Sequence, residues 1–390
     1  MLSRHFVART IAILTVTAAA TGSSNAENTV KIGIVMPMTG TLASAGLQVI
    51  AGARLYIKQH GDTVAGKKIE LIVRDDASSG ETGKRLIQEL IVNENVDVIG
   101  GGLTADLLPS APLLTETQKP AVIMLSSTTA VVEKSPFFVR TSGTLAQSSA
   151  IMADWAIQNG VGKVVTLVSE FAPGLEAEET FTDNFKAAGG QIAEAIRVPL
   201  KGPDFAPFLQ RVRDAAPQAV FVFIPSAQAA TFAKQFAERG LDKAGIKLIG
   251  PGDLTDDEAL SNMGDAMLGA VTAHFYSAAH PSMMNKAFAN EYQKDNHTRV
   301  NFMAASGYDG IHVIYQALNK TGGSTDGKAL VSAMKGSTWE SPRGPMAIDR
   351  ATGEVVHNIY IRKVEKVDGE LRNVEFATFK NIRDPRVAAK

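Results

Sequence analysis

Two doubly wound α/β lobes are the architecture that the sequence predicts. Short strands that are apolar throughout alternate with amphipathic helices along the chain, and this alternation begins again after Gly143. Strands without a polar face are typical of a parallel sheet that helices cover on both sides. The length of 390 residues also favours two domains, since roughly 150 residues per domain is a common size.

The first half of the chain supplies the elements of one lobe. Its apolar runs predict four strands, at residues 30–35, 69–73, 96–99 and 121–124. Between the strands, apolar residues recur at helical spacing over residues 49–57, 86–91 and 107–114. A strand that follows a helical crossover runs parallel to the one before it, so these elements predict a parallel sheet.

The second half repeats the pattern with different residues. Strands are predicted at residues 164–168, 220–224 and 247–249. Helices are predicted over residues 205–212, where Asp204 is placed to cap the first turn, and over residues 232–236 and 311–318. This half therefore predicts a second doubly wound lobe.

The C-terminal tail departs from the repeat. Residues 359–364 and 374–379 both read as strands, and Asp368-Gly369 lies between them. An Asp-Gly pair between two strand-like runs is a strong hairpin signal. The tail is therefore expected to be an antiparallel strand pair.

Residues 1–26 have the three-part pattern of a secretory signal peptide. Basic residues come first, residues 11–20 form a short apolar run, and Ser24-Asn25-Ala26 provides small residues before a cleavage site. The run is shorter than the roughly 20 residues that span a membrane, which disfavours an anchor. We expect cleavage after about Ala26, a periplasmic location, and no membrane insertion of the remaining chain.

Composition excludes several functional classes. The sequence has 39 basic and 40 acidic residues, so it lacks the positive charge of a nucleic-acid-binding protein. It has no cysteine, which removes disulfides, thiol nucleophiles and cysteine-type zinc sites.

The loops that follow the predicted strands are rich in Gly, Ser and Thr. In an open α/β sheet, ligands bind beyond the carboxyl ends of the strands, where these loops lie. Their hydroxyl and backbone N–H groups at helix N-termini suit a carboxylate or another small anion. The same residues are also ordinary helix caps, and for a single loop capping is the simpler interpretation. The loops in question are residues 37–41, 100–104, 126–129, 170–174, 225–226 and 250–253.

Catalytic signatures are absent from the sequence. It contains neither the G-x-S-x-G nor the H-E-x-x-H pattern, and its seven histidines lack the spacing of metal-binding pairs. Asp75 and Asp76 are adjacent, so on an extended chain they point to opposite faces and cannot easily share acid–base work. We expect no catalytic residue, no metal and no cofactor, and therefore not an enzyme.

Several short motifs, taken in order, resemble one family. They are residues 31–40 (KIGIVMPMTG), 73–76 (VRDD), 98–100 (VIG), 140–142 (RTS) and 250–253 (GPGD). The chain is similar in these to the leucine/isoleucine/valine-binding family of periplasmic solute-binding proteins, which have the type I fold and feed ABC importers. The resemblance covers nearly all of the chain after residue 26.

The resemblance implies two lobes joined by a three-strand hinge, with a small carboxylate ligand clamped between them. The N-terminal lobe would comprise residues 27–142 and 275–352, and the C-terminal lobe residues 143–274 and 353–390. The chain would cross between the lobes near residues 141–143, 273–276 and 349–354. The implied partner is a membrane permease, and the implied state is a monomer.

The family's ligand-binding positions carry over residue by residue. Carboxylate and amine contacts fall on the loops after the third and fourth strands, an aromatic lid falls on residue 171, and Ala45 replaces a first-loop aromatic, which would widen the site. The implied ligand-binding residues are Thr104, Ala105, Ser127, Thr128, Thr129, Phe171, Asp253 and Tyr276.

Ligand identity depends on one acidic residue. The family's acid for the ligand ammonium aligns with Gly252, and Asp253 is the next residue. An Asp253 side chain that faces the cleft would favour an α-amino acid. One that faces away would favour an amine-free or aromatic acid. A sensory module that reports to a separate receptor, instead of an importer component, is a further alternative.

Overall fold

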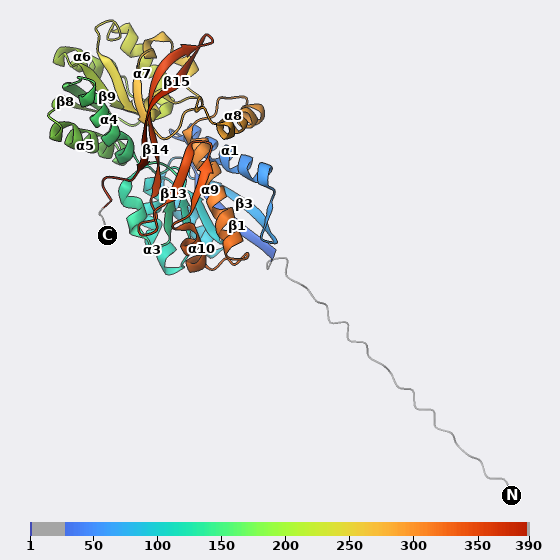
Figure 1. The fold of residues 1–390 in the computed structure, drawn as a ribbon. Helices are drawn as coiled ribbons and strands as arrows, with labels where there is room; N and C mark the ends of the chain where they lie inside the picture. Colours follow the sequence, from blue (N-terminus) through green and yellow to red (C-terminus); the bar gives the residue numbers. More distant parts are fainter. Residues whose placement is uncertain (2–27, 388–390) are drawn as a thin grey trace.

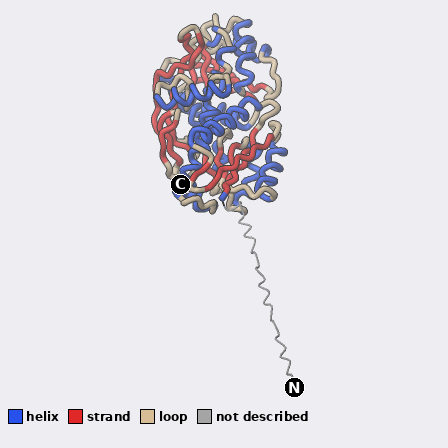
Figure 2. The backbone as a smooth tube through the Cα atoms, turned by 90° about the vertical axis from the view of Figure 1, so that its right-hand side faces the viewer, coloured by secondary structure: helices blue, strands red, loops and turns tan. Residues whose placement is uncertain are grey.

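The computed structural model describes residue 1 and residues 28–387, which form two α/β lobes. Figures 1 and 2 show each lobe as a sheet with helices on both sides. The predicted signal peptide and its cleavage site lie outside the described residues. Among the described residues, no helix has both the length and the apolar character needed to cross a membrane.

Lobe 1 is built on a six-stranded sheet whose order is β2-β3-β1-β4-β5-β6. All neighbouring strands are parallel except the short edge strand β2. The strands are β1 (Thr29–Met36), β2 (Thr63–Val64), β3 (Lys67–Asp75), β4 (Val98–Gly101), β5 (Ala121–Ile123) and β6 (Phe138–Arg140). The helices are α1 (Ala43–His60), α2 (Gly80–Val92), α3 (Thr104–Glu116), α8 (Met283–Asn296), α9 (Phe302–Lys320) and α10 (Gly327–Met334).

Alternating side chains of β1 explain why this sheet is covered on both faces. Ile32 and Ile34 pack with buried residues of α1 and α9, whereas Val35 packs with buried residues of α2 and α3. Successive side chains of a strand point to opposite faces, so an apolar strand needs a helix layer on each side. This is the doubly wound arrangement that the apolar strands predict.

Lobe 2 contains the parallel strands β8-β7-β9-β10-β11, extended on one side by antiparallel β14. The parallel strands are β7 (Lys163–Ser169), β8 (Gln191–Val198), β9 (Ala219–Phe223), β10 (Lys247–Pro251) and β11 (Val271–His274). The helices are α4 (Leu145–Gln158), α5 (Ala172–Ala187), α6 (Ala206–Ala215) and α7 (Ser226–Glu238), and short 3₁₀ turns include η3 (Gly252–Thr255).

Strand β14 (Val355–Val367) belongs to both lobes. Its first residues pair with β13 (Gly344–Ile348), which pairs in turn with β12 (Thr338–Ser341) beside lobe 1. From Tyr360 to Lys363 it pairs with β11, and from His357 onward it also pairs with β15 (Glu370–Ile382). This pairing places the third passage between the lobes within β14, a few residues beyond the predicted segment 349–354.

The other two passages follow β6 and β11. After β6 the chain continues through residues 141–144 into α4, and after β11 it returns through residues 275–282 to α8. The sequence prediction of two parallel-sheet lobes with a C-terminal antiparallel pair is confirmed. The elements bring the carboxyl ends of both sheets to face each other, and Figure 1 shows the long β14 running from one lobe to the other.

Candidate ligand-binding cleft

A cavity of about 440 Å³ lies between the two lobes. Its volume falls in the range of roughly 300–1,000 Å³ that small-molecule sites occupy. The loops that line it follow β1, β4 and β5 in lobe 1 and β7, β9 and β10 in lobe 2. These are the loops at the carboxyl ends of the strands, where the sequence predicts a ligand site.

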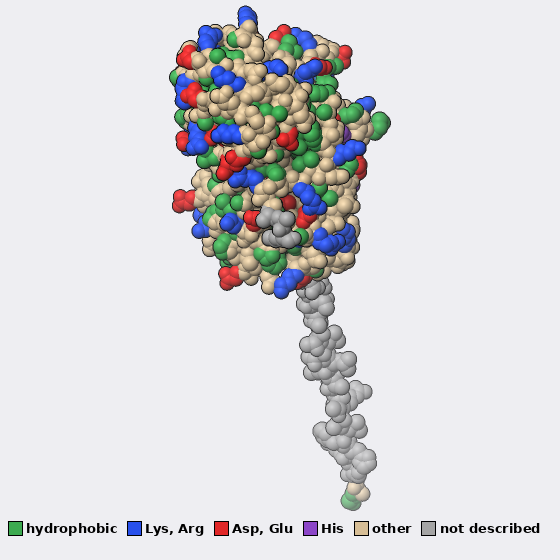
Figure 3. Space-filling view, turned by 60° about the vertical axis from the view of Figure 1, so that its left-hand side comes forward, with side chains coloured by type: hydrophobic (Ala, Val, Ile, Leu, Met, Phe, Trp, Pro, Cys, Tyr) green, Lys and Arg blue, Asp and Glu red, His purple; other side chains and the backbone are tan. Residues whose placement is uncertain are grey.

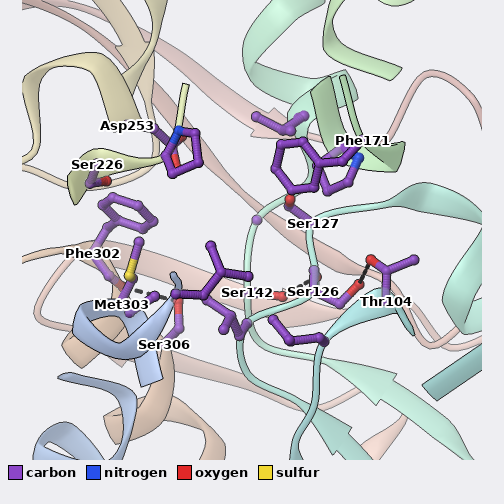
Figure 4. A pocket seen from close by; sticks show the side chains of 18 of the residues that line it. Thr104, Ser126, Ser127, Ser142, Phe171, Ser226, Asp253, Phe302, Met303 and Ser306 are labelled. Carbon is purple, nitrogen blue, oxygen red and sulfur yellow. Dashed lines mark hydrogen bonds between the residues drawn. The ribbon is translucent and has the colours of Figure 1, made fainter. Parts of the chain in front are cut away.

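The lobe 1 wall carries a cluster of hydroxyl groups. Thr104 Oγ1 lies 2.7 Å from Ser126 Oγ and 3.0 Å from Thr128 Oγ1. Thr104 and Ser126 line the cavity together with the half-buried Ser127. Figure 4 shows Thr104, Ser126 and Ser127 on the same side of the cavity. Such hydroxyls can reorient and donate to an anion.

The N-terminus of α3 adds backbone donors to this wall. Asp106 N–H and Leu107 N–H donate to Leu103 O and so begin the helical hydrogen bonds. The N–H groups of Thr104 and Ala105 precede them, and both residues line the cavity. Unused N–H groups and the helix dipole together favour a negatively charged group. This wall is therefore suited to a carboxylate.

A buried pair of acids supports the start of α3. Asp106 Oδ2 accepts a hydrogen bond of 2.9 Å from Leu103 N–H, and its carboxyl group also shares a hydrogen bond with Asp76. Burial, together with the neighbouring Asp76, raises the pKa of Asp106 to about 8, although the hydrogen bond from Leu103 N–H opposes this rise. Two carboxyl groups in contact require a shared proton, so the pair holds a proton at neutral pH.

We expect this pair to make stability depend on pH. The raised pKa means that the folded protein binds a proton that the unfolded chain releases above about pH 4. Stability should therefore fall as pH rises from about 4 to about 8 and then level off. Asp106→Asn keeps the acceptor for Leu103 N–H and should flatten this fall. Thermal denaturation of the wild type and of Asp106→Asn from pH 5 to 9 measures this difference. If the melting temperatures of the two proteins change with pH in the same way, the shared proton of Asp76 and Asp106 is not the cause.

The lobe 2 wall is largely apolar. Phe171 is half-buried, precedes the first residue of α5, and stacks on Phe223 with ring centroids 5.9 Å apart. Both rings line the cavity, as do Leu200 and Pro225. Phe171, for which the sequence predicts a lid role, therefore lies in the cavity wall. Its ring is a hydrophobic surface that has no hydrogen-bonding group.

Asp253 and Ser226 are polar exceptions in lobe 2. Asp253 lies in η3 and lines the cavity, and Figure 4 shows both side chains across the cavity from Thr104 and Ser126. Burial raises the pKa of Asp253 to about 7, although the nearby Arg362 guanidinium opposes this rise. The carboxyl group is therefore present in both its neutral and its ionised form near pH 7.

The hinge side of the cavity is aromatic. His274, at the end of β11, has its ring centroid 4.3 Å from Phe275 and 4.3 Å from Phe302. All three residues line the cavity, and sequence analysis did not single them out. His274 and Phe275 lie in the crossing predicted near residues 273–276, whereas Phe302, the first residue of α9, lies outside every predicted crossing.

Three predicted residues do not line the cavity, because their hydroxyl groups bond elsewhere. The Thr128 hydroxyl meets Thr104, and the fully buried Tyr276 donates to Asn285 Oδ1 at 2.9 Å. Thr129 donates its N–H to Glu176, and its hydroxyl, which has a single proton to donate, lies 2.8 Å from Glu176 Oε1 and 2.6 Å from Asp384 Oδ2. By contrast, Thr104, Ala105, Ser127, Phe171 and Asp253 do line it, and so does Ala45.

The face of the molecule in Figure 3 carries charges of both signs. Figure 3 shows basic and acidic side chains interspersed over the visible face of both lobes. This face has no continuous basic stripe of the kind that binds nucleic acids. Within residues 28–387, no group of three or more His, Asp and Glu side chains is arranged to hold a metal ion.

Comparison with known proteins agrees with this geometry. The family model described as periplasmic binding protein matches residues 29–370. The curated Leu/Ile/Val-binding protein homolog 6 of Brucella melitensis is 39% identical over 367 residues, which cover 93% of this chain and 94% of that protein.

Solved structures with the same fold include two from Rhodopseudomonas palustris. A solute-binding protein of an ABC transporter from strain BisB5, in complex with 3,4-dihydroxybenzoic acid, is 58% identical, has a TM-score of 0.90, and covers 92% of this chain and 99% of its own. One from strain HaA2, in complex with p-hydroxybenzoic acid, is 38% identical with a TM-score of 0.89 and the same coverages. The chain therefore belongs to the periplasmic binding protein family, as a substrate-binding protein of an ABC transporter and not an enzyme.

Proposed function

We propose that this protein binds an aromatic carboxylate of the hydroxybenzoate class between its lobes and delivers it to a membrane permease. The main support is that the cavity wall has hydrogen-bond donors on one side and mostly apolar side chains elsewhere. Donors at the start of α3 face an enclosure that is otherwise mostly apolar and aromatic. A carboxylate on a flat apolar ring matches this division. The hydroxybenzoates in the two Rhodopseudomonas palustris relatives support the same class.

The carboxylate would lie against lobe 1. The hydroxyls of Thr104 and Ser127 and the N–H groups of Thr104 and Ala105 can all donate to it. Hydrogen bonds to an ionised acceptor are stronger than those between neutral groups. Thr129, which the sequence predicts as a ligand contact, has no part in this proposal because its donors are occupied by acids.

The ring would lie among the aromatic side chains. Phe171 closes the site from lobe 2, and Phe275 and Phe302 border it at the hinge. Aromatic pairs gain from stacked or edge-on contacts in addition to buried area. Ala45 leaves space in the first loop, where an aromatic residue would reduce the room for a ring.

A branched-chain amino acid is the second candidate, and Asp253 favours it. The side chain lines the cavity, as a partner for a ligand ammonium should, and the Brucella relative carries a Leu/Ile/Val-binding name. Two features count against this candidate. The raised pKa of Asp253 weakens its negative charge at neutral pH, and the nearby Arg362 disfavours a second cation.

Calorimetric titration distinguishes the two candidates. The protein is first unfolded and refolded to remove any bound ligand, which needs no oxidant because the chain has no cysteine. Benzoate, 4-hydroxybenzoate and 3,4-dihydroxybenzoate are then compared with leucine, isoleucine and valine. We expect binding of the aromatic acids alone. Binding of the amino acids alone would overturn the proposal.

Ligand binding would favour a closed arrangement of the lobes. A ligand shifts such an equilibrium only if it binds one state better, and contacts from both lobes provide that difference. Thr129, between β5 and β6, donates to Glu176 Oε1 of α5 at 3.0 Å through its N–H and 2.8 Å through its hydroxyl. These bonds join the lobes independently of the ligand.

Glu176→Ala should weaken the binding of every ligand by a similar factor of about 10, because it removes charge-assisted bonds that the closed arrangement contains. Glu179→Ala is the matched control, since this exposed acid of the same helix pairs only with Arg386 among the described residues. Titration with benzoate and 4-hydroxybenzoate measures both variants. A change in the preference between the two ligands would contradict a purely inter-lobe role.

The remaining parts of the proposal concern location and partners. We propose a periplasmic monomer, exported by the predicted signal peptide, that docks on a permease. A sensory role with a separate receptor is distinguished by deleting the gene. Loss of 4-hydroxybenzoate uptake with normal induction of its catabolic genes supports import, whereas normal uptake with lost induction supports sensing.

A further inference from the structure

Asp253 is an ionisable side chain of lobe 2 that a ligand in the cavity can reach. Among the described residues, two ionisable side chains line the cavity, Asp253 and His274. Both ring nitrogens of His274 have almost no accessible area, so a ligand cannot contact them. Asp253 is half-buried, and neither of its carboxyl oxygens is sealed in this way. Of the two, only Asp253 can therefore interact with a polar group of a ligand.

The accessible part of Asp253 faces the cavity and not the outer surface of the protein. The residue lies in η3, directly after β10, and lines the cavity. Enough protein surrounds it to raise its pKa to about 7, an effect of burial that an acid on the outer surface would not have. Figure 4 shows the side chain across the cavity from Thr104. The carboxyl group thus lies opposite the donors of α3.

The carboxyl group of Asp253 receives no hydrogen bond from any other described residue. The nearby Arg362 guanidinium lowers its pKa through charge alone, because its N–H groups donate to Gly252 O, Thr272 Oγ1 and Tyr276 O. Buried polar groups are normally paired, and an unpaired one costs free energy. A hydrogen-bond donor on the ligand would therefore be favourable at this end of the cavity.

We propose that Asp253 is the specificity-determining residue that binds a ring hydroxyl of the ligand. A phenolic hydroxyl donates one proton, and a carboxyl oxygen can accept it. An ammonium group could also donate, but its charge would be unfavourable near Arg362, whereas a hydroxyl brings no charge. This inference rests on the proposed function, since it presumes that the ligand carboxylate lies at the N-terminus of α3. Benzoate would leave the carboxyl group of Asp253 unpaired against an apolar ring and should bind more weakly.

The test compares acids that differ only at the ring position opposite the carboxylate. Wild type and Asp253→Leu are titrated with benzoate, 4-hydroxybenzoate and 4-fluorobenzoate, because fluorine is close to a hydroxyl in size but cannot donate. Wild type should bind 4-hydroxybenzoate about 10- to 100-fold more tightly than the other two acids. Asp253→Leu, which keeps the branched shape without the oxygens, should lose most of that preference. Asp265→Leu is the matched control and should retain it, since Asp265 is 65% exposed and pairs with Lys366.

The outcomes separate this inference from the proposed function. If wild type binds none of the three acids, the proposed function fails and the inference fails with it. If wild type binds 4-hydroxybenzoate and 4-fluorobenzoate equally, or if Asp253→Leu keeps the wild-type preference, the inference alone is overturned. Should Asp253→Leu not fold, Asp253→Asn takes its place, because an amide keeps an acceptor without the charge. Its preference for 4-hydroxybenzoate should fall several-fold, and an unchanged preference would refute the role of Asp253.

Discussion

Thr104→Val combined with Ser127→Ala should reduce affinity for every carboxylate ligand by about 100-fold or more. Each substitution removes one hydroxyl donor to the anion, and a hydrogen bond to a charged group contributes roughly 1.5–3 kcal/mol. The valine also leaves the hydroxyls of Ser126 and Thr128 without their shared partner. Isothermal titration with benzoate and 4-hydroxybenzoate measures the loss, which should be equal for the two acids.

The matched control for this double variant is Thr115→Val. Thr115 is another threonine of α3, and its hydroxyl donates to Ala111 O at 2.7 Å, far from the N-terminus of the helix. The affinity of the Thr115→Val variant for both acids should match that of the wild type. If the double variant binds both acids with wild-type affinity, the ligand carboxylate does not lie at the N-terminus of α3, and the proposed anion site is wrong.

Arg140→Met should lower the free energy of unfolding by about 3–5 kcal/mol, the usual result of breaking a buried ion pair. Arg140 is fully buried at the end of β6, where its Nε donates to Glu354 Oε2 at 2.7 Å. Its other donors bind Ser126 O and Thr128 O and so hold the loop of the hydroxyl cluster. Methionine would leave the buried Glu354 carboxylate without its cation, while Ser126 O and Thr128 O would each keep only their other donor, Ser142 Oγ and Val131 N–H respectively.

Urea unfolding of the ligand-free protein measures this loss, with Arg383→Met as the comparison. Arg383 is 69% exposed and pairs with Asp349, so its removal should change stability by at most about 1 kcal/mol. Adding Glu354→Gln to Arg140→Met should restore part of the loss, because a neutral amide is cheaper to bury than an unpaired charge. If Arg140→Met and Arg383→Met lower the free energy of unfolding equally, burial of the Arg140 ion pair does not explain its contribution to stability.

The sequence was most informative where burial is complete. The strands around Ile32 and Val222 are apolar on both faces, and amphipathic helices flank them in the sequence. This combination predicts a parallel sheet that helices cover on both sides. Edge strand β8 did not stand out because most of its residues are exposed or half-buried and its pattern is mixed. The pair β12–β13 is short and has the same difficulty.

The candidate site was only partly predictable, for a different physical reason. Sequence places a hydroxyl on a loop but does not say which neighbour will take its hydrogen bond. Thr129 and Thr104 look alike in sequence, yet Thr129 is committed to Glu176 and Asp384 whereas Thr104 lines the cavity. His274 and Phe302 reach the cavity only because the chain crosses twice between the lobes, which is a property of the tertiary fold.

Strand β14 has a consequence for the order in which the molecule can assemble. Residues 355–367 complete hydrogen bonding on both sides of the hinge, and they lie near the end of a chain of 390 residues. Their partners in β11 were synthesised about ninety residues earlier, and such distant pairings form slowly because a long loop must close first. The sheet of lobe 2 therefore stays incomplete until this C-terminal segment is present, whereas the six strands of the lobe 1 sheet do not include β14. The strand that joins the two lobes is thus among the last segments of the chain to be synthesised. Completion of the fold must therefore wait for the end of synthesis.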